Sequence, residues 1–231
     1  MKNLFLLFYN FFEDYIHLRR IKIFLSRKVF LKEPIIFDVG SHEGKLVKLM
    51  NNLYENATIY CFEPNKSMNG KLKKVGKNVK VYNYALGSRN EEKNFLINQI
   101  DLTNTLSKIN KDSIYLKFKN LIINKSIKDK NYKKIKVISL KHFCDTKKIK
   151  YIDFLKIDVE GFEYNVLLGA KHIIKNVKFI MLEIQKNNMY SGYSKKKIEK
   201  ILKKNKFKLV KSFKFPFMFF EDRIYKREKI N

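Results

Sequence analysis

The sequence predicts an α/β domain whose central sheet is mostly parallel and is covered by helices on both faces. From residue 34 onward, short apolar segments alternate with segments whose apolar residues recur at helical spacing. The first apolar segment, 35–39, passes through Asp38 into a turn bounded by Gly40 and Gly44, and a helical pattern follows it. A strand that turns through glycines into a helix exposes backbone N–H groups to a ligand. We therefore expect an α/β fold with a ligand site at this turn.

The composition is that of one globular domain with a strong positive charge. The chain has 231 residues, of which 45% are hydrophobic, enough for a full core. Its 50 basic and 22 acidic residues give a net charge of +28, which would suit nucleic acid or an anionic membrane surface. Lys exceeds Arg, however, and Lys is abundant throughout the chain. We interpret the charge mainly as a compositional bias and expect no specific nucleic-acid partner.

The first 31 residues are predicted to form an amphipathic helical extension, followed by the main domain at 32–231. The apolar run at 3–12 is too short to span a bilayer as a helix, and acidic residues end it. We expect the extension to cover the domain, with peripheral membrane contact or dimerisation as alternatives. The oligomeric state is not defined by the sequence.

The cysteine pattern indicates a reducing environment. Cys61 and Cys144 form neither a zinc-binding spacing nor a disulfide framework. A cytoplasmic location is therefore expected, peripheral to the membrane if the extension binds there.

The expected elements follow in regular order. Strands are expected at 35–39, 57–62, 79–85, 93–97, 134–140, 151–158, 177–184, 207–213 and 222–226, with 93–97 pairing back at an edge and 222–226 antiparallel. Helices are expected at 43–53, 65–75, 141–146, 162–174 and 194–204. Residues 99–131 form a polar insertion whose length is typical of a functional or mobile segment.

Acids at the ends of the first two strands predict a ligand with a ribose and an amino group. Glu63 ends the second strand, where an acid can accept ribose hydroxyls, although it could instead cap the next helix. Three residues separate Gly40 from Gly44, so the dinucleotide fingerprint is absent, and so is a phosphate-binding Gly-Lys-Ser/Thr loop. Asp38, before the first glycine, suits an ammonium group better than a phosphate. S-adenosylmethionine, which carries an ammonium group and a free ribose, fits these features.

Several motifs occur in the order found in a known family. They are Asp38-Val39-Gly40 through Gly44, Phe62-Glu63-Pro64, Ala85-Leu86-Gly87 and Leu155-Lys156-Ile157-Asp158-Val159-Glu160-Gly161-Phe162-Glu163, followed by Glu183. Over about residues 34–213 the chain resembles the FkbM family of S-adenosylmethionine-dependent methyltransferases. The resemblance implies the class I methyltransferase (Rossmann-like) fold, with a seven-stranded sheet whose last strand is antiparallel. It also implies O-methylation, often of sugar or polyketide hydroxyls.

With this resemblance, a set of cofactor-binding residues is expected. They are Asp38, Gly40, Ser41, Gly44, Glu63, Ala85 and Asp158. The glycine turn would hold the methionine part, Glu63 the ribose, and Asp158 the amino or methyl end. The family's commonest form has Ala-Asn-Ile between the glycines, whereas this chain has Ser41-His42-Glu43. We expect His42 to be an exposed turn residue, with a cofactor or substrate contact as the alternative.

The catalytic candidates are Asp158, Glu160 and Glu183. Methylation of an alcohol requires that a weakly acidic hydroxyl be positioned and deprotonated. Glu160 and Glu183 would act as base or substrate holder, because crowded carboxylates raise one another's pKa. The same cluster could bind Mg²⁺, so a divalent metal stays open, but no metal site is predicted.

Two neighbouring charged residues have less certain roles. Glu163 belongs either to the acid cluster or only to the first turn of its helix, where it would stabilise the helix. Lys156 lies in a central strand, where a charge needs a partner, and Asp38 or Glu183 is expected to pair with it.

The sequence thus predicts an S-adenosylmethionine-dependent O-methyltransferase acting on a hydroxyl of a sugar or glycan, such as a cell-surface polysaccharide or a related metabolite. An RNA methyltransferase is an alternative favoured by the charge. Against it, the Asn/Asp-Pro-Pro-Tyr motif and clustered Arg residues are absent. A non-catalytic membrane-surface protein that retains the fold is the third reading.

Overall fold

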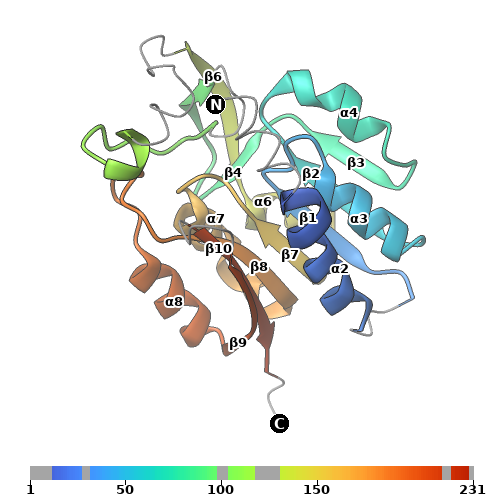
Figure 1. Cartoon of the computed structure of the whole chain (residues 1–231). Coiled ribbons are helices and arrows are strands. Elements are labelled where there is room, and N and C mark those ends of the chain that lie inside the picture. Colours follow the sequence, from blue (N-terminus) through green and yellow to red (C-terminus); the bar gives the residue numbers. More distant parts are fainter. Residues whose placement is uncertain (1–11, 28–31, 98–103, 118–130, 215–219, 229–231) are drawn as a thin grey trace.

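The computed structural model describes residues 12–27, 32–97, 104–117, 131–214 and 220–228 (Figure 1). Its centre is a seven-stranded sheet with the strand order β3-β2-β1-β7-β8-β10-β9. The strands are β1 Ile35–Val39, β2 Thr58–Phe62, β3 Val79–Tyr82, β7 Ile152–Ile157, β8 Val177–Gln185, β9 Phe207–Lys214 and β10 Phe220–Arg227. β10, the last strand of the chain, is antiparallel to both of its neighbours. The expected class I methyltransferase sheet is confirmed.

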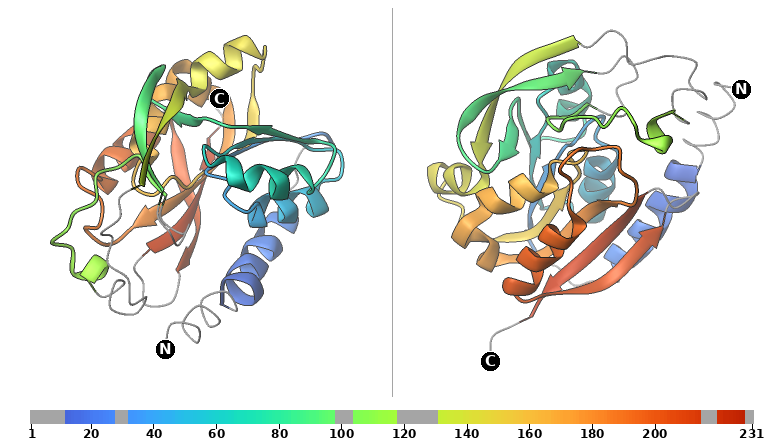
Figure 2. Two further views of the ribbon diagram at one scale, coloured as in Figure 1. Left: turned by 90° about the horizontal axis from the view of Figure 1, so that it is seen from above. Right: turned by 90° about the vertical axis from the view of Figure 1, so that its left-hand side faces the viewer.

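Helices cover both faces of this sheet, and Figures 1 and 2 show α2 and α8 on opposite sides of it. On one face lie α2 Leu18–Ser26, α3 Lys45–Leu53 and α4 Asn69–Lys73, and on the other α6 Leu140–Thr146, α7 Glu163–Ala170 and α8 Lys195–Lys204. Successive strand residues face opposite ways, so Ile36 joins the core under the first set of helices and Phe37 the core under the second. The chain also forms the short helices η1 Phe12–His17, η2 Lys66–Met68 and η3 Lys171–Asn176.

A second, three-stranded sheet corrects one prediction. The segment 79–85, expected as one strand, divides into β3 and β4 Ala85–Gly87. β4 pairs with β6 Asn131–Ser139, which also pairs with β5 Glu91–Ile97, so the strand expected near 93–97 belongs to this small sheet. The chain bends between the two strands, where the Asn83 amide donates to the backbone oxygen of Glu63 at 3.1 Å.

Close packing joins the small sheet to the main domain. A Cβ atom at Gly169 of α7 would lie 1.9 Å from the backbone oxygen of Gly87 in β4. Only glycine therefore allows α7 to approach β4 this closely. The expected helix 162–174 is likewise divided, into α7 and η3.

The N-terminal segment packs on the domain over the residues that the structure describes. Ile21 and Leu25 of α2 are each 1% exposed and join the core cluster that contains Met50 and Phe213. The Tyr54 hydroxyl donates to the backbone oxygen of Leu25 at 2.9 Å. Most of the apolar run at 3–12 lies outside the described residues. Among the described helices, none has the length and apolar character needed to cross a membrane.

The described part of the insertion also contacts the domain. Thr105 forms an isolated bridge with Leu96 of β5, and Ile109 forms one with Tyr190. Residues 114–117 are helical. Residues 99–103 and 118–130 of the expected insertion lie outside the described part of the chain.

Candidate active site

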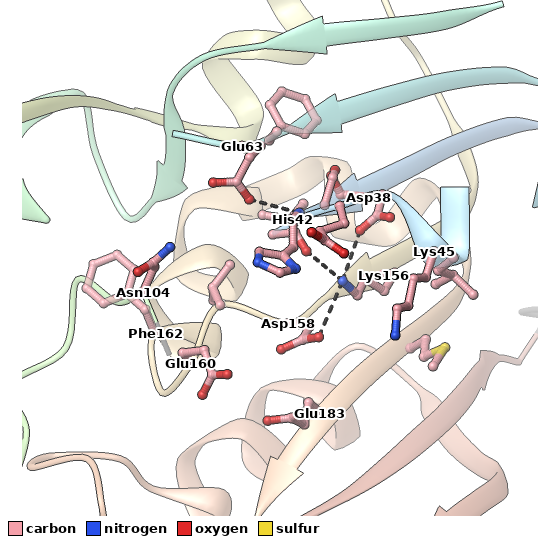
Figure 3. A pocket seen from close by; sticks show the side chains of 18 of the residues that line it. Asp38, His42, Lys45, Glu63, Asn104, Lys156, Asp158, Glu160, Phe162 and Glu183 are labelled. Atoms are coloured by element: carbon pink, nitrogen blue, oxygen red, sulfur yellow. Dashed lines mark hydrogen bonds and ion pairs between the residues drawn. The ribbon is translucent and has the colours of Figure 1, made fainter. Parts of the chain in front are cut away.

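One pocket lies at the carboxyl ends of β1, β2, β7 and β8, where open α/β sheets bind ligands (Figure 3). The small sheet and the N-terminal helical segment also contribute to its walls. The expected site residues in its lining are Asp38, Gly40, Ser41, Glu63, Ala85, Asp158, Glu160 and Glu183. Gly44 is the one expected residue outside this lining.

The glycine turn is shaped by contacts that only glycine permits. Gly40 has φ +81°, and a Cβ there would lie 1.8 Å from the backbone oxygen of Asp158. Gly44 has φ +80° and precedes α3, and its Cβ would lie 2.8 Å from a methyl group of Leu72. The turn is held by hydrogen bonds from Gly40 N to Phe62 O (3.0 Å) and from the Ser41 hydroxyl to Asp38 O (2.8 Å). Gly44 is therefore needed for the turn and for packing on α4.

Glu63 is buried and held by backbone donors. Its Oε2 accepts from His42 N at 2.9 Å, and its Oε1 accepts from Asn65 N at 2.8 Å. The N-cap of η2 is Asn65, whose side chain accepts from Ser67 N, so this capping does not require Glu63. Burial raises the pKa of Glu63, and the two backbone hydrogen bonds oppose that rise. Each carboxylate oxygen keeps a second lone pair, which fits the two hydroxyls of a ribose.

Lys156 lies at the centre of the pocket, between two acids. Its Nζ donates to Gly40 O at 2.7 Å and lies 3.1 Å from Asp38 Oδ1 and 3.4 Å from Asp158 Oδ2. The expected ion pair with Asp38 is confirmed. Burial alone would lower the pKa of Lys156, but Asp38 and Asp158 outweigh it and raise the pKa. Two carboxylates around one ammonium leave a net negative charge, which fits a cationic ligand.

The three catalytic candidates come together at the other end of the pocket. Figure 3 shows Glu160 and Glu183 beyond Asp158, away from Glu63. Oxygen atoms of Asp158, Glu160 and Glu183 lie within 4.8 Å of one another. This spacing could accommodate a divalent cation, and we assign no metal to it.

Glu160 and Glu183 each accept a hydrogen bond within this cluster. The Tyr190 hydroxyl donates to Glu160 Oε2, and the Gln185 amide donates to Glu183 Oε1. Burial raises the pKa of Glu183 well above its ordinary value, and the charges of Asp158 and Glu160 raise it further. Glu183 therefore keeps its proton to a higher pH than an exposed glutamate does.

Glu163 lies outside the pocket lining and holds a backbone turn of the site. It is fully buried at the start of α7, and its Oε1 accepts from Val159 N at 3.2 Å and from Gly161 N at 3.0 Å. Burial raises its pKa to about 8. Glu163 is absent from the pocket lining, so it acts as a first-turn acid whose carboxyl group holds the turn that carries Glu160.

The structure corrects the expectation for His42. Its side chain is half-buried and lines the pocket, instead of lying in an exposed turn. Its φ is +45°, a region where Asn, Asp and His are enriched among non-glycine residues. This conformation explains why His can stand where the family commonly has Asn.

Other lining residues were not expected from the sequence. His17 and Asp222 also line the pocket, as do Lys45, Asn104 and Phe162. Asp222 lies two residues before buried Ile224 on β10 and so shares its face of the sheet, a pattern that could have indicated an inward-facing acid. His17 lies in a segment interpreted only as a cover, and no local pattern connects it to the site.

Comparisons with known proteins agree with this geometry. The model of the methyltransferase FkbM domain matches residues 38–209. The 2-O-methyltransferase NoeI of Sinorhizobium fredii is 22% identical over 173 residues, which are 69% of this chain and 67% of that protein.

Solved structures of methyltransferases resemble the chain in fold. Magnesium protoporphyrin IX methyltransferase of Synechocystis, with bound S-adenosylmethionine, has a TM-score of 0.51 at 12% identity, covering 91% of this chain and 77% of that one. An rRNA methylase of Streptococcus thermophilus has a TM-score of 0.51 at 11% identity, covering 92% and 97%. At these identities the likeness shows a shared fold and nothing about the acceptor.

Proposed function

The chain belongs to the FkbM methyltransferase family, and from this premise we propose that it methylates a hydroxyl group of a sugar or glycan. As a family member it is a methyltransferase that depends on S-adenosylmethionine. The observation that carries the proposed acceptor is the cluster of Asp158, Glu160 and Glu183 at one end of the pocket. Carboxylates are hydrogen-bond acceptors suited to sugar hydroxyls.

The other end of the pocket suits the cofactor. Glu63 would bind the ribose hydroxyls through the lone pairs that its backbone donors leave available. The net negative group of Asp38, Lys156 and Asp158 would attract the positively charged amino-acid end. Gly40, Ser41 and Ala85 would contact the cofactor through the pocket wall. When bound, S-adenosylmethionine supplies an electrophilic methyl group.

The acids at the acceptor end would bind and orient the hydroxyl. Of the two roles expected for Glu160 and Glu183, substrate holder is the better supported. Each already accepts a hydrogen bond from a neighbour, which holds its carboxyl group in place. Orientation of the oxygen toward the methyl group lowers the barrier by avoiding an entropic cost at the moment of reaction.

The same acids argue against an RNA acceptor. The net charge of +28 favours a nucleic-acid partner in general terms. At the acceptor end, however, three carboxylates converge, and they would repel the phosphates that flank any nucleotide. The charge of the whole chain and the charge of the site therefore point to different partners, and the site is where the acceptor must bind.

The test is methylation by the purified full chain, with S-adenosylmethionine as the methyl donor. Neutral methyl glycosides, anionic glycuronides and total RNA would be offered separately, and products would be identified by mass spectrometry. We expect a mass increase of one methylene unit on a neutral glycoside, with release of S-adenosylhomocysteine. Methylation of RNA alone, or no binding of S-adenosylmethionine in calorimetry, would overturn the proposal.

A further inference from the structure

The N-terminal helical segment has a packed inner face and an exposed outer face. His17, Ile21 and Leu25 follow one another at intervals of four residues and are buried against the domain. The residues on the other side of the segment are exposed, and Figure 2 shows α2 at the periphery of the fold. This outer face consists of Tyr15, Ile16, Arg19, Arg20, Lys22, Ile23, Ser26 and Arg27.

The outer face holds apolar side chains in contact with water. Tyr15 is 67% exposed, Ile23 43% and Ile16 37%. Their exposure is not that of a loose helix, because Ile21 and Leu25 of the same segment are anchored in the core. In the sequence, the apolar run at 3–12 leads directly into this segment. Transfer of such side chains from water into an apolar medium is favourable, so the outer face suits a partly apolar partner.

The outer face also holds cations that lack acidic partners within the described part of the chain. α2 contains Arg19, Arg20 and Lys22 and no acidic residue, and Arg27 is its C-cap. None of these side chains forms an ion pair with another described residue. Long cationic side chains can cover apolar surface with their stems and keep the charged end in water. Their charge suits an anionic partner.

α8, on the opposite side of the sheet, shows the effect of charge alone. Lys196, Lys197 and Lys200 of α8 are exposed, whereas its apolar residues Ile198 and Leu202 are buried. The general excess of Lys in the chain therefore accounts for the surface of α8. Of these two helical segments, only the N-terminal one adds exposed apolar side chains to the positive charge.

We propose that the outer face docks on the anionic surface of a lipid bilayer. In such a complex the apolar side chains enter the headgroup region and the cations lie against lipid phosphates. Nucleic acid would engage the cations but leave Tyr15, Ile16 and Ile23 in water. A second copy of the chain, packed through the same face, would bring like charges together. An anionic lipid surface is the partner that uses both features of the outer face.

Docking through this face would hold the pocket beside the membrane. His17, Leu18 and Ile21 line the pocket from the inner side of the same segment. The proposal does not rest on the proposed function, because lipid binding is measured without any methyl acceptor. Failure to methylate a glycoside would therefore leave it standing.

The first test is sedimentation of the full chain with lipid vesicles. One kind would contain equal parts of phosphatidylglycerol and phosphatidylcholine, and the other phosphatidylcholine alone. We expect affinity for the anionic vesicles to be higher by a factor of about ten or more, and to fall as salt is added. Equal affinity for the two kinds of vesicle, or no binding to the anionic one, would overturn the proposal.

A pair of double variants separates the outer face from the charge of the whole chain. Arg19→Ser with Lys22→Ser removes cations from the outer face, and Lys196→Ser with Lys200→Ser removes as many exposed cations from α8. We expect affinity for anionic vesicles to fall about tenfold or more in the first protein and less than about twofold in the second. Equal losses would show that net charge alone drives binding, and the proposal would fail.

A second pair tests the apolar contribution. Ile23→Ser is compared with Leu168→Ser, whose side chain is 41% exposed on α7, on the other side of the sheet. We expect about a fivefold loss of vesicle affinity for Ile23→Ser and no change for Leu168→Ser. Thermal unfolding would verify that both variants are folded. Unchanged vesicle binding by Ile23→Ser, together with loss of a dimer seen by light scattering in the wild type, would assign the face to a second copy instead.

Discussion

The two ends of the pocket are built from different kinds of group. At the proposed cofactor end, backbone groups from Gly40, His42 and Asn65 hold the turn and the carboxylate of Glu63. At the proposed acceptor end, side chains hold one another, as Tyr190 does with Glu160 and Gln185 with Glu183. Backbone contacts are set by the fold itself, whereas side-chain contacts can change one residue at a time. Under the proposed assignment, the cofactor site would be fixed by the fold, and the acceptor site beside it would be able to vary.

The largest effect is expected from Gly40→Ala at the cofactor end. The new methyl group would meet the Asp158 backbone oxygen at 1.8 Å, and the backbone there has φ +81°. We expect S-adenosylmethionine binding to be lost in calorimetry and the free energy of unfolding to fall by about 3 kcal/mol or more. The control is Gly192→Ala, which has φ +80° but no atom within 4 Å of the added Cβ, and which should cost about 1 kcal/mol. Equal losses in the two variants would show that the close contact does not matter.

The next largest loss of stability is expected from Lys156→Met, which removes the cation between Asp38 and Asp158. Asp38 would then be buried without its ion pair, and breaking such a pair costs about 3–5 kcal/mol. Urea denaturation would measure the loss. Lys71→Met is the comparison, since Lys71 pairs with Glu43 at the surface and should change stability by about 0.5 kcal/mol or less. A stable Lys156→Met protein would mean that Asp38 is protonated in the native state.

An effect that appears only as the pH rises is expected from Glu163→Gln, next to the proposed acceptor end. The folded pKa of Glu163 is about 8, above its ordinary 4.5, so its proton is bound more tightly in the folded state. The stabilisation is complete below pH 4.5 and is lost as the pH rises through about 8. The wild type should therefore lose on the order of 5 kcal/mol over this range relative to Glu163→Gln, which keeps an oxygen for Val159 N and Gly161 N. If the free energy of unfolding depended on pH in the same way in both proteins, the raised pKa of the buried Glu163 would be contradicted.

The smallest effect is expected from Glu183→Gln. Gln resembles a protonated Glu. Because the pKa of Glu183 is raised, its replacement by Gln should cause only a modest loss of activity. We expect kcat/KM for the acceptor to fall about tenfold, or about 1.4 kcal/mol, while S-adenosylmethionine affinity is kept. Glu183→Ala, which removes the polar group, should lose more. A fall in kcat by a factor of about 10² or more in the glutamine variant would instead make Glu183 the base.

The contrast between the two ends of the pocket also explains which residues can be predicted from the sequence. The cofactor end consists of motifs that are contiguous in the chain, from Asp38 to Gly44 and around Asp158, so their chemistry could be interpreted locally. Alternation of apolar segments likewise predicts the main sheet, because each strand buries residues on both faces. The break between β3 and β4 was not predicted, because the two strands pair in different sheets and this partition is set by the folded chain.

The acceptor end was only partly predictable. Asp158 and Glu160 lie in one motif, but His17 and Asp222 are 205 residues apart and meet only in the folded chain. The burial of His42 also depends on what packs around the turn, which no local pattern encodes. Residues that act through long-range packing need the structure to be found.

A calorimetric comparison of two variants tests the division of the pocket most directly. S-adenosylmethionine would be titrated into the wild type, Glu63→Ala and Glu160→Ala. We expect binding to weaken about a hundredfold for Glu63→Ala, because about two charge-assisted hydrogen bonds to ribose hydroxyls are lost, and to stay within about twofold of wild type for Glu160→Ala. Equal weakening in both variants, or wild-type affinity in Glu63→Ala, would contradict a cofactor end at Glu63 and an acceptor end at Glu160.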